Sequence, residues 1–237
     1  MSGAVSKPAR SVTYGVEAVV FDLDGLLIDS EGVWNAARKE VALQRGGRWP
    51  PEAQRAMMGM SSTEWSAYMH DRLAVAMSPE KISGTVVARL AELYREHLPL
   101  IPGARETVIR LARVWPLALA SSANRPLIEL VLELAELRGC FIATVSSEEV
   151  RRGKPAPDVY LEAARRIDVP PVRCAAVEDS SNGLRSAAAA GMVIFAVPNR
   201  EFPPAEDALA LAADALHSIA QLTPDRVRSA AAKALSS

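Results

Sequence analysis

The segment 19–31 reads VVFDLDGLLIDSE, and its first seven residues restrict the fold most strongly. Three apolar residues precede Asp22 and Asp24, and Gly25 follows directly. A short apolar run of this kind is typical of a buried strand in a parallel sheet, and open α/β sheets bind ligands just beyond the carboxyl ends of such strands. Because side chains alternate along a strand, Asp22 and Asp24 point to the same side. Converging carboxylates repel each other, and a hard divalent cation such as Mg²⁺ would relieve that repulsion.

The composition is that of a globular protein with no evident macromolecular partner. The 237 residues are 49% hydrophobic, which suffices for one large domain or a domain with an insertion. The 27 basic and 28 acidic residues give a net charge of −1, so we expect no nucleic-acid partner. Cys140 and Cys174 fit no metal or redox spacing and are expected to be free, buried thiols.

The sequence contains no recognisable membrane or targeting segment. Residues 1–14 lack the apolar centre of a signal peptide and are expected to form a mobile polar tail, and no run of about 20 apolar residues occurs. We therefore expect a soluble cytoplasmic protein without a membrane partner. Nothing in the sequence indicates an oligomeric state, and a monomer is the default expectation.

The chain divides into two kinds of segment. Residues 30–98 show helical periodicity broken by Gly, Pro and Ser, which predicts an all-helical unit. Elsewhere, short apolar runs alternate with helical patterns, which predicts a doubly wound, Rossmann-like parallel sheet with helices on both faces. This core would comprise 1–29 and 99–237, with 30–98 inserted as a cap after the first strand. The expected strands are 17–22, 117–120, 142–145, 174–177 and 193–197; the expected helices are 104–113, 126–137, 157–167 and 183–190, with 208–213 also helical.

Polar residues follow the later strands too. Ser121, Ser122 and Asn124 combine a hydroxyl with the free N–H groups of a helix N-terminus, an arrangement that binds anions, although alone it fits a simple N-cap better. Lys154 precedes a proline and approaches the next helix in extended form, from where it can reach a phosphate, although alone it fits an exposed lysine better.

A second acidic pair, Glu178 and Asp179, lies beyond the strand 174–177. By itself this pair could belong to a helix cap. Two acidic pairs, a hydroxyl and a lysine, all at strand ends of one predicted sheet, exceed what capping explains.

These motifs resemble those of the haloacid dehalogenase superfamily of phosphohydrolases. The resemblance covers residues 17–222 and includes four motifs: Asp22-Leu23-Asp24-Gly25, Ser121, Lys154 within GKPAPD, and Glu178-Asp179. The helical insertion resembles the α-helical cap of the subfamily that contains β-phosphoglucomutase and small sugar phosphatases. The longer match FDLDGLLIDSE, followed by Trp34, is most similar to hexose-phosphate phosphatases.

The resemblance implies a phosphatase that acts through an aspartyl-phosphate. Asp22 would be the nucleophile, and Asp24 would protonate the leaving oxygen and then take a proton from water. Ser121 and Lys154 would hold the phosphoryl oxygens and neutralise charge. The expected substrate is a small phosphomonoester, best fitted by a sugar phosphate, with phosphoglycolate and nucleoside monophosphates left open. The further residues expected at the substrate are Ser122, Asn124, Glu31 and Trp34.

The same resemblance implies a Mg²⁺ site. The ligands would be Asp22, the backbone carbonyl of Asp24, and Asp179, with Glu178 supporting directly or through water. Asn182 would orient the metal loop. In the cap, Glu31, Trp34 and the segment 59–65 are candidates for substrate contacts, while core packing explains the cap tryptophans better. The cap arginines, Arg38 among them, cannot be sorted into pocket and surface.

Three alternatives remain at this point. A phosphomutase is disfavoured because its relatives have a cap His and Arg where this chain has Trp34 and Ser62. A true haloacid dehalogenase needs no metal and lacks the second Asp of the first motif, so Asp24 and the pair Glu178-Asp179 oppose it. A non-catalytic protein on this fold would be expected to lose the nucleophile or a metal ligand, and neither is missing.

Overall fold

The computed structural model describes residues 15–58 and 60–234, and its core is a six-stranded parallel sheet with the order β3-β2-β1-β4-β5-β6. The expected tail 1–14 and Gly59 of the cap segment lie outside the described residues. The strand order reverses at β1, whose neighbours are β2 and β4, and ligands of such sheets bind at this switch point. The strands are β1 (Ala18–Phe21), β2 (Leu117–Ser121), β3 (Ala143–Ser146), β4 (Cys174–Glu178), β5 (Val193–Ala196) and β6 (Asp214–Ala215).

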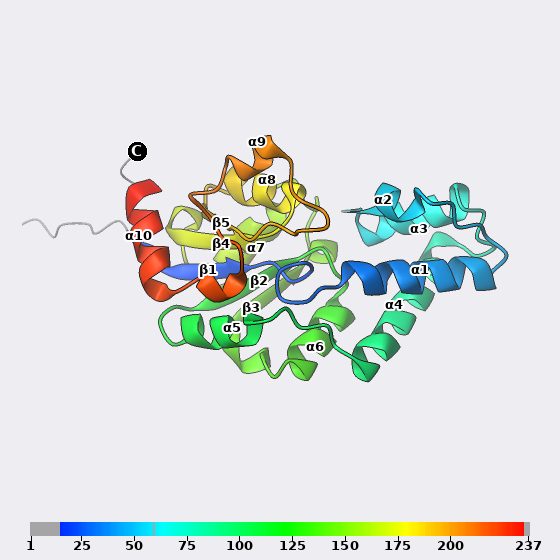
Figure 1. Ribbon diagram of the computed structural model, residues 1–237, viewed down its shortest axis with the longest axis horizontal. Coiled ribbons are helices and arrows are strands. Elements are labelled where there is room, and N and C mark those ends of the chain that lie inside the picture. Colours follow the sequence, from blue (N-terminus) through cyan, green and yellow to red (C-terminus); the bar gives the residue numbers. More distant parts are fainter. Residues whose placement is uncertain (1–14, 59, 235–237) are drawn as a thin grey trace, which may run out of the picture.

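The sheet is buried on both faces, as its continuous apolar strands predict. Val19 and Phe21 of β1 belong to one apolar cluster, and Ala18 and Val20 belong to another on the opposite face. Helices α5, α6 and α10 contribute to the first cluster, and α7 and α8 to the second, so the sheet lies between two helical layers (Figure 1). These helices are α5 (Ala104–Ala112), α6 (Arg125–Leu134), α7 (Asp158–Arg166), α8 (Ser181–Ala189) and α10 (Pro224–Ala234).

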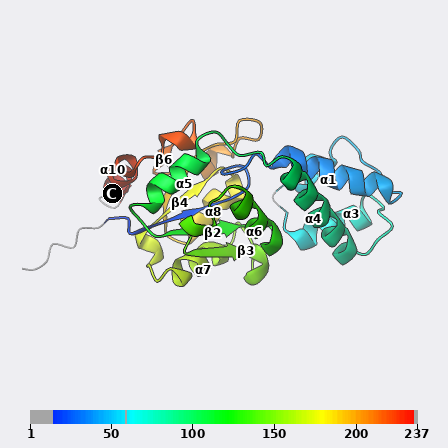
Figure 2. The same ribbon diagram turned by 90° about the horizontal axis from the view of Figure 1, so that it is seen from below.

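The insertion after β1 is helical, as expected. It contains α1 (Glu31–Gln44), α2 (Ala53–Met57), α3 (Ser62–Asp71) and α4 (Pro79–Glu96), with no strand in its described part. Buried Ile82, Val86, Leu90 and Tyr94 recur along one face of α4, a helical spacing of apolar side chains. Figures 1 and 2 show the four helices as a lobe at one end of the sheet, with α4 reaching α6.

The chain enters and leaves this helical lobe through two segments that lie side by side. Ile28 forms an antiparallel bridge with Leu100, and the amide of Asp29 donates to the carbonyl of Pro99 at 2.8 Å. Ile101 returns a bond to the Leu27 carbonyl at 2.9 Å. The lobe is therefore attached to the core by a double connection close to the end of β1.

The segment after β5 differs from the sequence-based expectation. The Ala-rich stretch 208–213 is not a helix: α9 (Glu206–Leu209) ends after its first residues, and the chain turns into the two-residue strand β6. The reason is tertiary, because the amide of Ala213 donates to Ile194 and that of Leu216 to Ala196, which pairs the segment with β5. The strand β6 and the helix α10 were not among the elements predicted from the sequence. Within the described residues, none of the helices combines the length and apolar character needed to cross a bilayer.

Candidate active site

The first acidic pair lies directly beyond β1 and is fixed by residues from other elements. Asp22 is buried, and its Oδ1 accepts a hydrogen bond from the Lys154 ammonium at 2.6 Å. Asp24 accepts from two sides: the indole Nε1 of Trp34 reaches Oδ1 at 3.3 Å, and the Ser121 hydroxyl lies 3.5 Å from Oδ2. Trp34 comes from α1, so the cap contacts one of the two carboxylates directly.

The second acidic pair follows β4 and divides into two different environments. Glu178 is fully buried and accepts from Lys154 at 2.6 Å and from the Tyr160 hydroxyl at 2.7 Å. Its other oxygen accepts from the backbone N–H groups of Asp179 and Ser180 and from the Ser180 hydroxyl. Asp179 is also buried, but its Oδ1 has no hydrogen-bond partner in the described part of the chain. A buried carboxylate oxygen without a hydrogen bond is energetically unfavourable, and a bound cation would compensate for the missing partner.

The carboxylates of Asp22, Glu178 and Asp179 lie close enough to share an ion, with one oxygen of each within 4.8 Å of the others. Three hard oxygen donors and a buried, unpaired Asp179 oxygen fit a Mg²⁺ ion. Because the hydrogen bonds of Glu178 occupy both its oxygens, Asp22 and Asp179 are the better placed ligands.

Burial and mutual repulsion shift the protonation of this cluster. Burial raises the pKa of Asp22 to about 8, with Lys154 opposing the shift and Glu178 adding to it. Burial, together with Glu178, also raises the pKa of Asp179 well above its ordinary value. Burial alone would lower the pKa of Lys154, but the carboxylates of Asp22 and Glu178 outweigh it and raise that pKa. The ionised carboxylates are therefore unfavourable in this cluster unless further positive charge is present, which a divalent cation would supply.

Two glycines allow the backbone to approach these carboxylates. Gly25 has φ +77°, a conformation that favours glycine, and a Cβ there would lie 2.1 Å from an Asp179 oxygen. Gly183 is the third residue of α8, and a Cβ there would lie 1.9 Å from the Glu178 carboxylate. Ser180 caps the same helix by accepting from the Gly183 amide at 3.1 Å.

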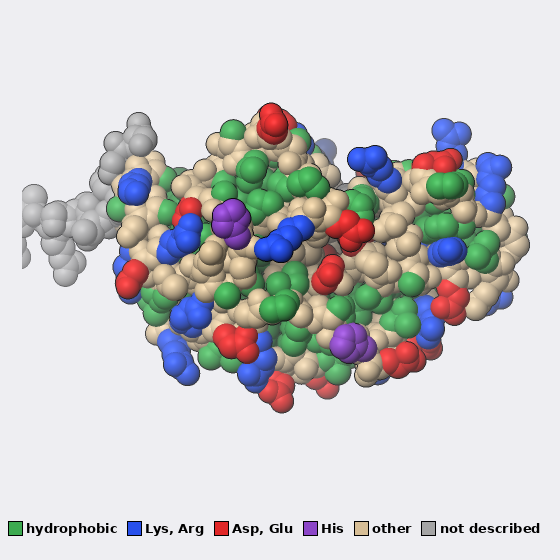
Figure 3. Space-filling view, in the orientation of Figure 1, with side chains coloured by type: hydrophobic (Ala, Val, Ile, Leu, Met, Phe, Trp, Pro, Cys, Tyr) green, Lys and Arg blue, Asp and Glu red, His purple; other side chains and the backbone are tan. Residues whose placement is uncertain are grey.

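A cavity of about 170 Å³ opens between the core and the helical lobe over this site. The space-filling view shows the outline notched where the two lobes meet (Figure 3). Met57, Met58 and Met60 supply apolar walls from the cap, and Phe202 adds one from the core. The sequence-predicted residues that line the cavity are Asp22, Asp24, Glu31, Trp34, Ser122, Lys154, Asp179 and Asn182.

Three predicted residues do not line this cavity. Ser121 is fully buried behind Asp24 and accepts from the Ala123 amide at 2.9 Å, and Glu178 lies behind Lys154. Asn124 is the N-cap residue of α6 without a side-chain capping bond; instead its amide group accepts from the Ser62 hydroxyl at 3.1 Å and donates to Glu148. Asn124 thus ties α3 of the cap to the core.

The comparison with known families agrees with the motifs and the fold. A model of the haloacid dehalogenase-like hydrolases matches residues 16–191, which include both acidic pairs, Ser121 and Lys154. This chain belongs to the haloacid dehalogenase-like hydrolases. The family and the fold with its inserted helical cap are therefore as the sequence predicts.

Relatives of this hydrolase carry phosphatase names. It is 32% identical over 228 residues to a probable pseudouridine-5'-phosphatase of Drosophila melanogaster, which covers 93% of this chain and 96% of the relative. It is 35% identical over 190 residues to hexitol phosphatase B of Escherichia coli K12, covering 78% and 84%. The crystal structure of CbbY from Rhodobacter sphaeroides in complex with phosphate superposes with a TM-score of 0.79 at 28% identity, covering 87% and 96%.

Some residues of the hydrolase site were not predicted from the sequence. Tyr160 holds Glu178, but it follows the helical pattern of α7 and reads as a core residue. Asn199 and Phe202 line the cavity from a loop after β5 whose path only the tertiary structure reveals. Of these missed residues, Arg38 could have been found from the sequence, because it lies one helical turn after Trp34 and therefore on the same face of α1.

Proposed function

We propose that this hydrolase is a Mg²⁺-dependent phosphatase that cleaves a small phosphomonoester, best fitted by a sugar phosphate, through an aspartyl-phosphate on Asp22. The observation that carries the proposal is the Lys154 ammonium, which binds both Asp22 and Glu178 at 2.6 Å beside the unpartnered Asp179 oxygen. In the proposed reaction, these three neighbouring buried groups serve as nucleophile, phosphate-binding cation and metal ligand.

The chain's residues divide the reaction between them. Asp22 attacks phosphorus, with Lys154 fixing its Oδ1 and neutralising charge on the phosphoryl oxygens. Asp24 protonates the leaving oxygen and afterwards removes a proton from the attacking water, while Trp34 and Ser121 hold its carboxylate in place. Ser122, which lines the cavity beyond β2, offers its hydroxyl and backbone N–H as donors to the phosphoryl oxygens.

Mg²⁺ would be held by Asp22, Asp179 and the Asp24 carbonyl, and when bound it supplies positive charge that stabilises the transferring phosphoryl group. We propose that Glu178 orients Lys154 and the turn at Asp179 rather than binding the ion itself, with Asn182 supporting the same loop. Tyr160 fixes Glu178 from behind.

We propose that residues 30–98 act as a cap that encloses the substrate and excludes water during the first half-reaction. Two contacts support this: Trp34 of α1 donates to Asp24, and Ser62 of α3 donates to Asn124. These two positions are also those where mutase relatives have His and Arg. Neither an indole that already binds Asp24 nor a serine bound to Asn124 provides a second phosphate clamp, so a phosphatase is favoured over a phosphomutase.

The test is release of inorganic phosphate from hexose, hexitol, pentose and short-chain phosphates, with and without Mg²⁺. We expect Mg²⁺-dependent release from one or a few of the polyol or sugar phosphates, and a strong chelator to abolish it. Full activity in the chelator would contradict the metal site. Isomerisation of β-glucose 1-phosphate to glucose 6-phosphate on addition of a bisphosphate, without phosphate release, would establish the mutase instead.

A further inference from the structure

Arg38 of α1 is a buried cation without hydrogen bonds. Arg38 is only 6% exposed, and its Nε atom has no hydrogen-bond partner in the described part of the chain. Across residues 15–58 and 60–234, the guanidinium forms neither a hydrogen bond nor an ion pair. Buried arginines are ordinarily paired, because an unsatisfied buried donor costs the free energy of its lost hydration.

The positive charge itself is accommodated. The guanidinium carbon lies 4.6 Å from the ring centroid of Trp34 and 5.0 Å from that of Trp65, distances typical of cation–π contacts. Burial lowers the pKa of Arg38 to about 10, and Glu31, two turns earlier in α1, opposes that shift. At neutral pH the side chain stays charged. What it lacks is acceptors for its N–H groups.

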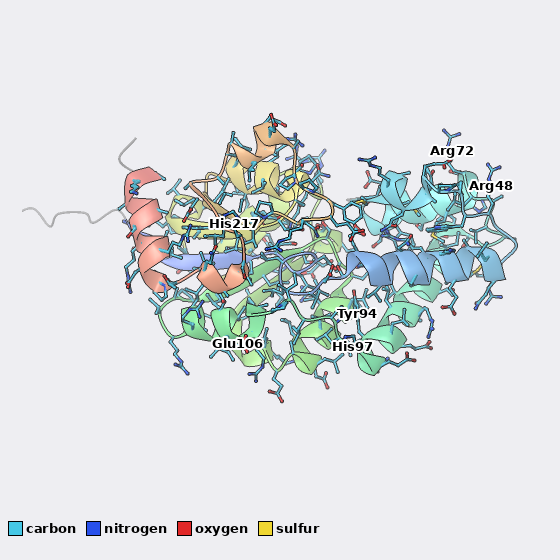
Figure 4. The ribbon with its side chains drawn as sticks, in the orientation of Figure 1. Arg48, Arg72, Tyr94, His97, Glu106 and His217 are labelled. Carbon is cyan, nitrogen blue, oxygen red and sulfur yellow. The ribbon has the colours of Figure 1, made fainter. Side chains whose placement is uncertain are left out.

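These N–H groups are placed where a substrate would bind. Arg38 lines the same cavity as Asp22 and Asp24, on the cap side, beside the apolar surfaces of Trp34 and Trp65. Tyr94 projects from α4 toward the start of α1 (Figure 4), where its buried hydroxyl lies near Ser30. The phosphoryl end of the cavity is occupied by Lys154, so the cap side is left for the leaving group.

We propose that Arg38 determines specificity by donating hydrogen bonds to hydroxyl oxygens of an uncharged polyol leaving group that packs against Trp34. This inference rests on the proposed phosphatase function. An uncharged group is favoured because the carboxylates of Glu31 and Asp24 line the same cavity as the guanidinium. A second phosphate or a carboxylate on the substrate would face those two carboxylates in that cavity, whereas hydroxyl groups can accept from Arg38 and donate to Glu31.

The experiment compares kcat/KM for three substrates in wild-type protein, Arg38→Met, Arg38→Lys and Arg72→Met. Sorbitol 6-phosphate presents hydroxyl groups, phenyl phosphate presents none, and 2-phosphoglycolate presents a carboxylate. Arg72→Met is the matched control, since Arg72 is exposed at the end of the cap farthest from the core (Figure 4). Thermal unfolding of all four proteins accompanies the kinetics.

We expect Arg38→Met to lower the ratio of kcat/KM for sorbitol 6-phosphate over phenyl phosphate roughly 10- to 100-fold, as expected for loss of hydrogen bonds from a charged donor. The loss should lie mainly in KM, and Arg38→Lys should recover part of it. Because Arg38 forms no hydrogen bond or ion pair with the described residues, we expect the melting temperature of Arg38→Met to change little.

Other outcomes overturn the inference in distinct ways. An equal loss for both substrates with a lower melting temperature would make Arg38 a structural residue. A wild-type preference for 2-phosphoglycolate that Arg38→Met abolishes would mean that Arg38 binds an anion. If wild-type protein releases no phosphate from any substrate in Mg²⁺, the proposed function fails, and this inference fails with it.

Discussion

Asp22 lies between a cation that favours its ionised form and carboxylates that oppose it. Lys154 donates to Oδ1, while Glu178 and Asp24 add negative charge nearby and burial removes water. We propose that a bound cation keeps this buried carboxylate ionised, the form in which it can act as the nucleophile. Activity and stability should therefore respond differently to its removal.

We expect Asp22→Asn to lower kcat by at least about 10³-fold, because an amide cannot attack phosphorus and the loss of a nucleophile removes most of the catalysis. The variant should unfold at the same temperature or higher, since Lys154 keeps its bond to Glu178 and one repelling charge is gone. Phosphate release and thermal unfolding measure the two effects, with Asp71→Asn on the surface of the cap as control. Normal turnover by Asp22→Asn would refute the nucleophile assignment.

At the scale of elements, β4 and α8 approach each other so closely that the helix admits only a glycine at its third residue. Glu178 ends the strand, and Gly183 faces its carboxylate from the first turn of the helix. The pairing holds Glu178 against Lys154 and Tyr160 and thereby fixes the geometry of the whole site.

We expect Gly183→Ala to lower the free energy of unfolding by about 1–3 kcal/mol and to lower kcat, because the new methyl group would displace the buried Glu178 carboxylate. Gly84→Ala is a matched control of opposite sign. Gly84 lies exposed within α4 with open space around it, so alanine there should raise stability by roughly 0.5–1 kcal/mol without affecting turnover. Urea unfolding and phosphate release distinguish the two. If Gly183→Ala had the stability and the kcat of the wild-type protein, the start of α8 would have to move away from Glu178 at no cost, and the close contact would not matter.

The elements that could be predicted are those with a strong local pattern. The apolar runs of β1 and β4 end at polar residues, so strand ends and acidic pairs were identified together. β6 has only two residues, too few to show any periodicity, and its pairing with β5 overrides the helical preference of the alanines at 210–213. Arg38 and Tyr160 have ordinary helical spacing, and only the packing of α1 and α7 against the core places them at the site.

At the scale of the whole molecule, the site joins two lobes that come from separate stretches of the chain. The proposed metal ligands lie on the core, while Trp34 and Ser62 contact the core from the cap. Binding of a cation by the native state alone should stabilise the fold as a whole. The extent of stabilisation should depend on pH, because protons compete for the same carboxylates.

In a chelator, Asp22 has a native pKa of about 8 against an ordinary value of 3.8, so the native state binds more protons than the unfolded state between these values. Stability without metal should therefore fall as pH rises from about 5 to about 8. Mg²⁺ binds the ionised carboxylates, so its stabilising effect should grow over the same interval. At saturating Mg²⁺ and pH 8 we expect roughly 3 kcal/mol, or about 5–10 °C in melting temperature.

The measurement is thermal unfolding at pH 5, 6.5 and 8, in a chelator and in Mg²⁺. Asp179→Asn serves as the matched variant, because it keeps the shape of the site but loses a charged ligand and should lose most of the Mg²⁺ effect. Its stability in the chelator should fall less steeply with pH, since burial and Glu178 raise the pKa of Asp179 as well. If Mg²⁺ stabilised both proteins equally at all three pH values, the ion would be bound elsewhere, and the pairing of Asp22 with Asp179 as its ligands would be wrong.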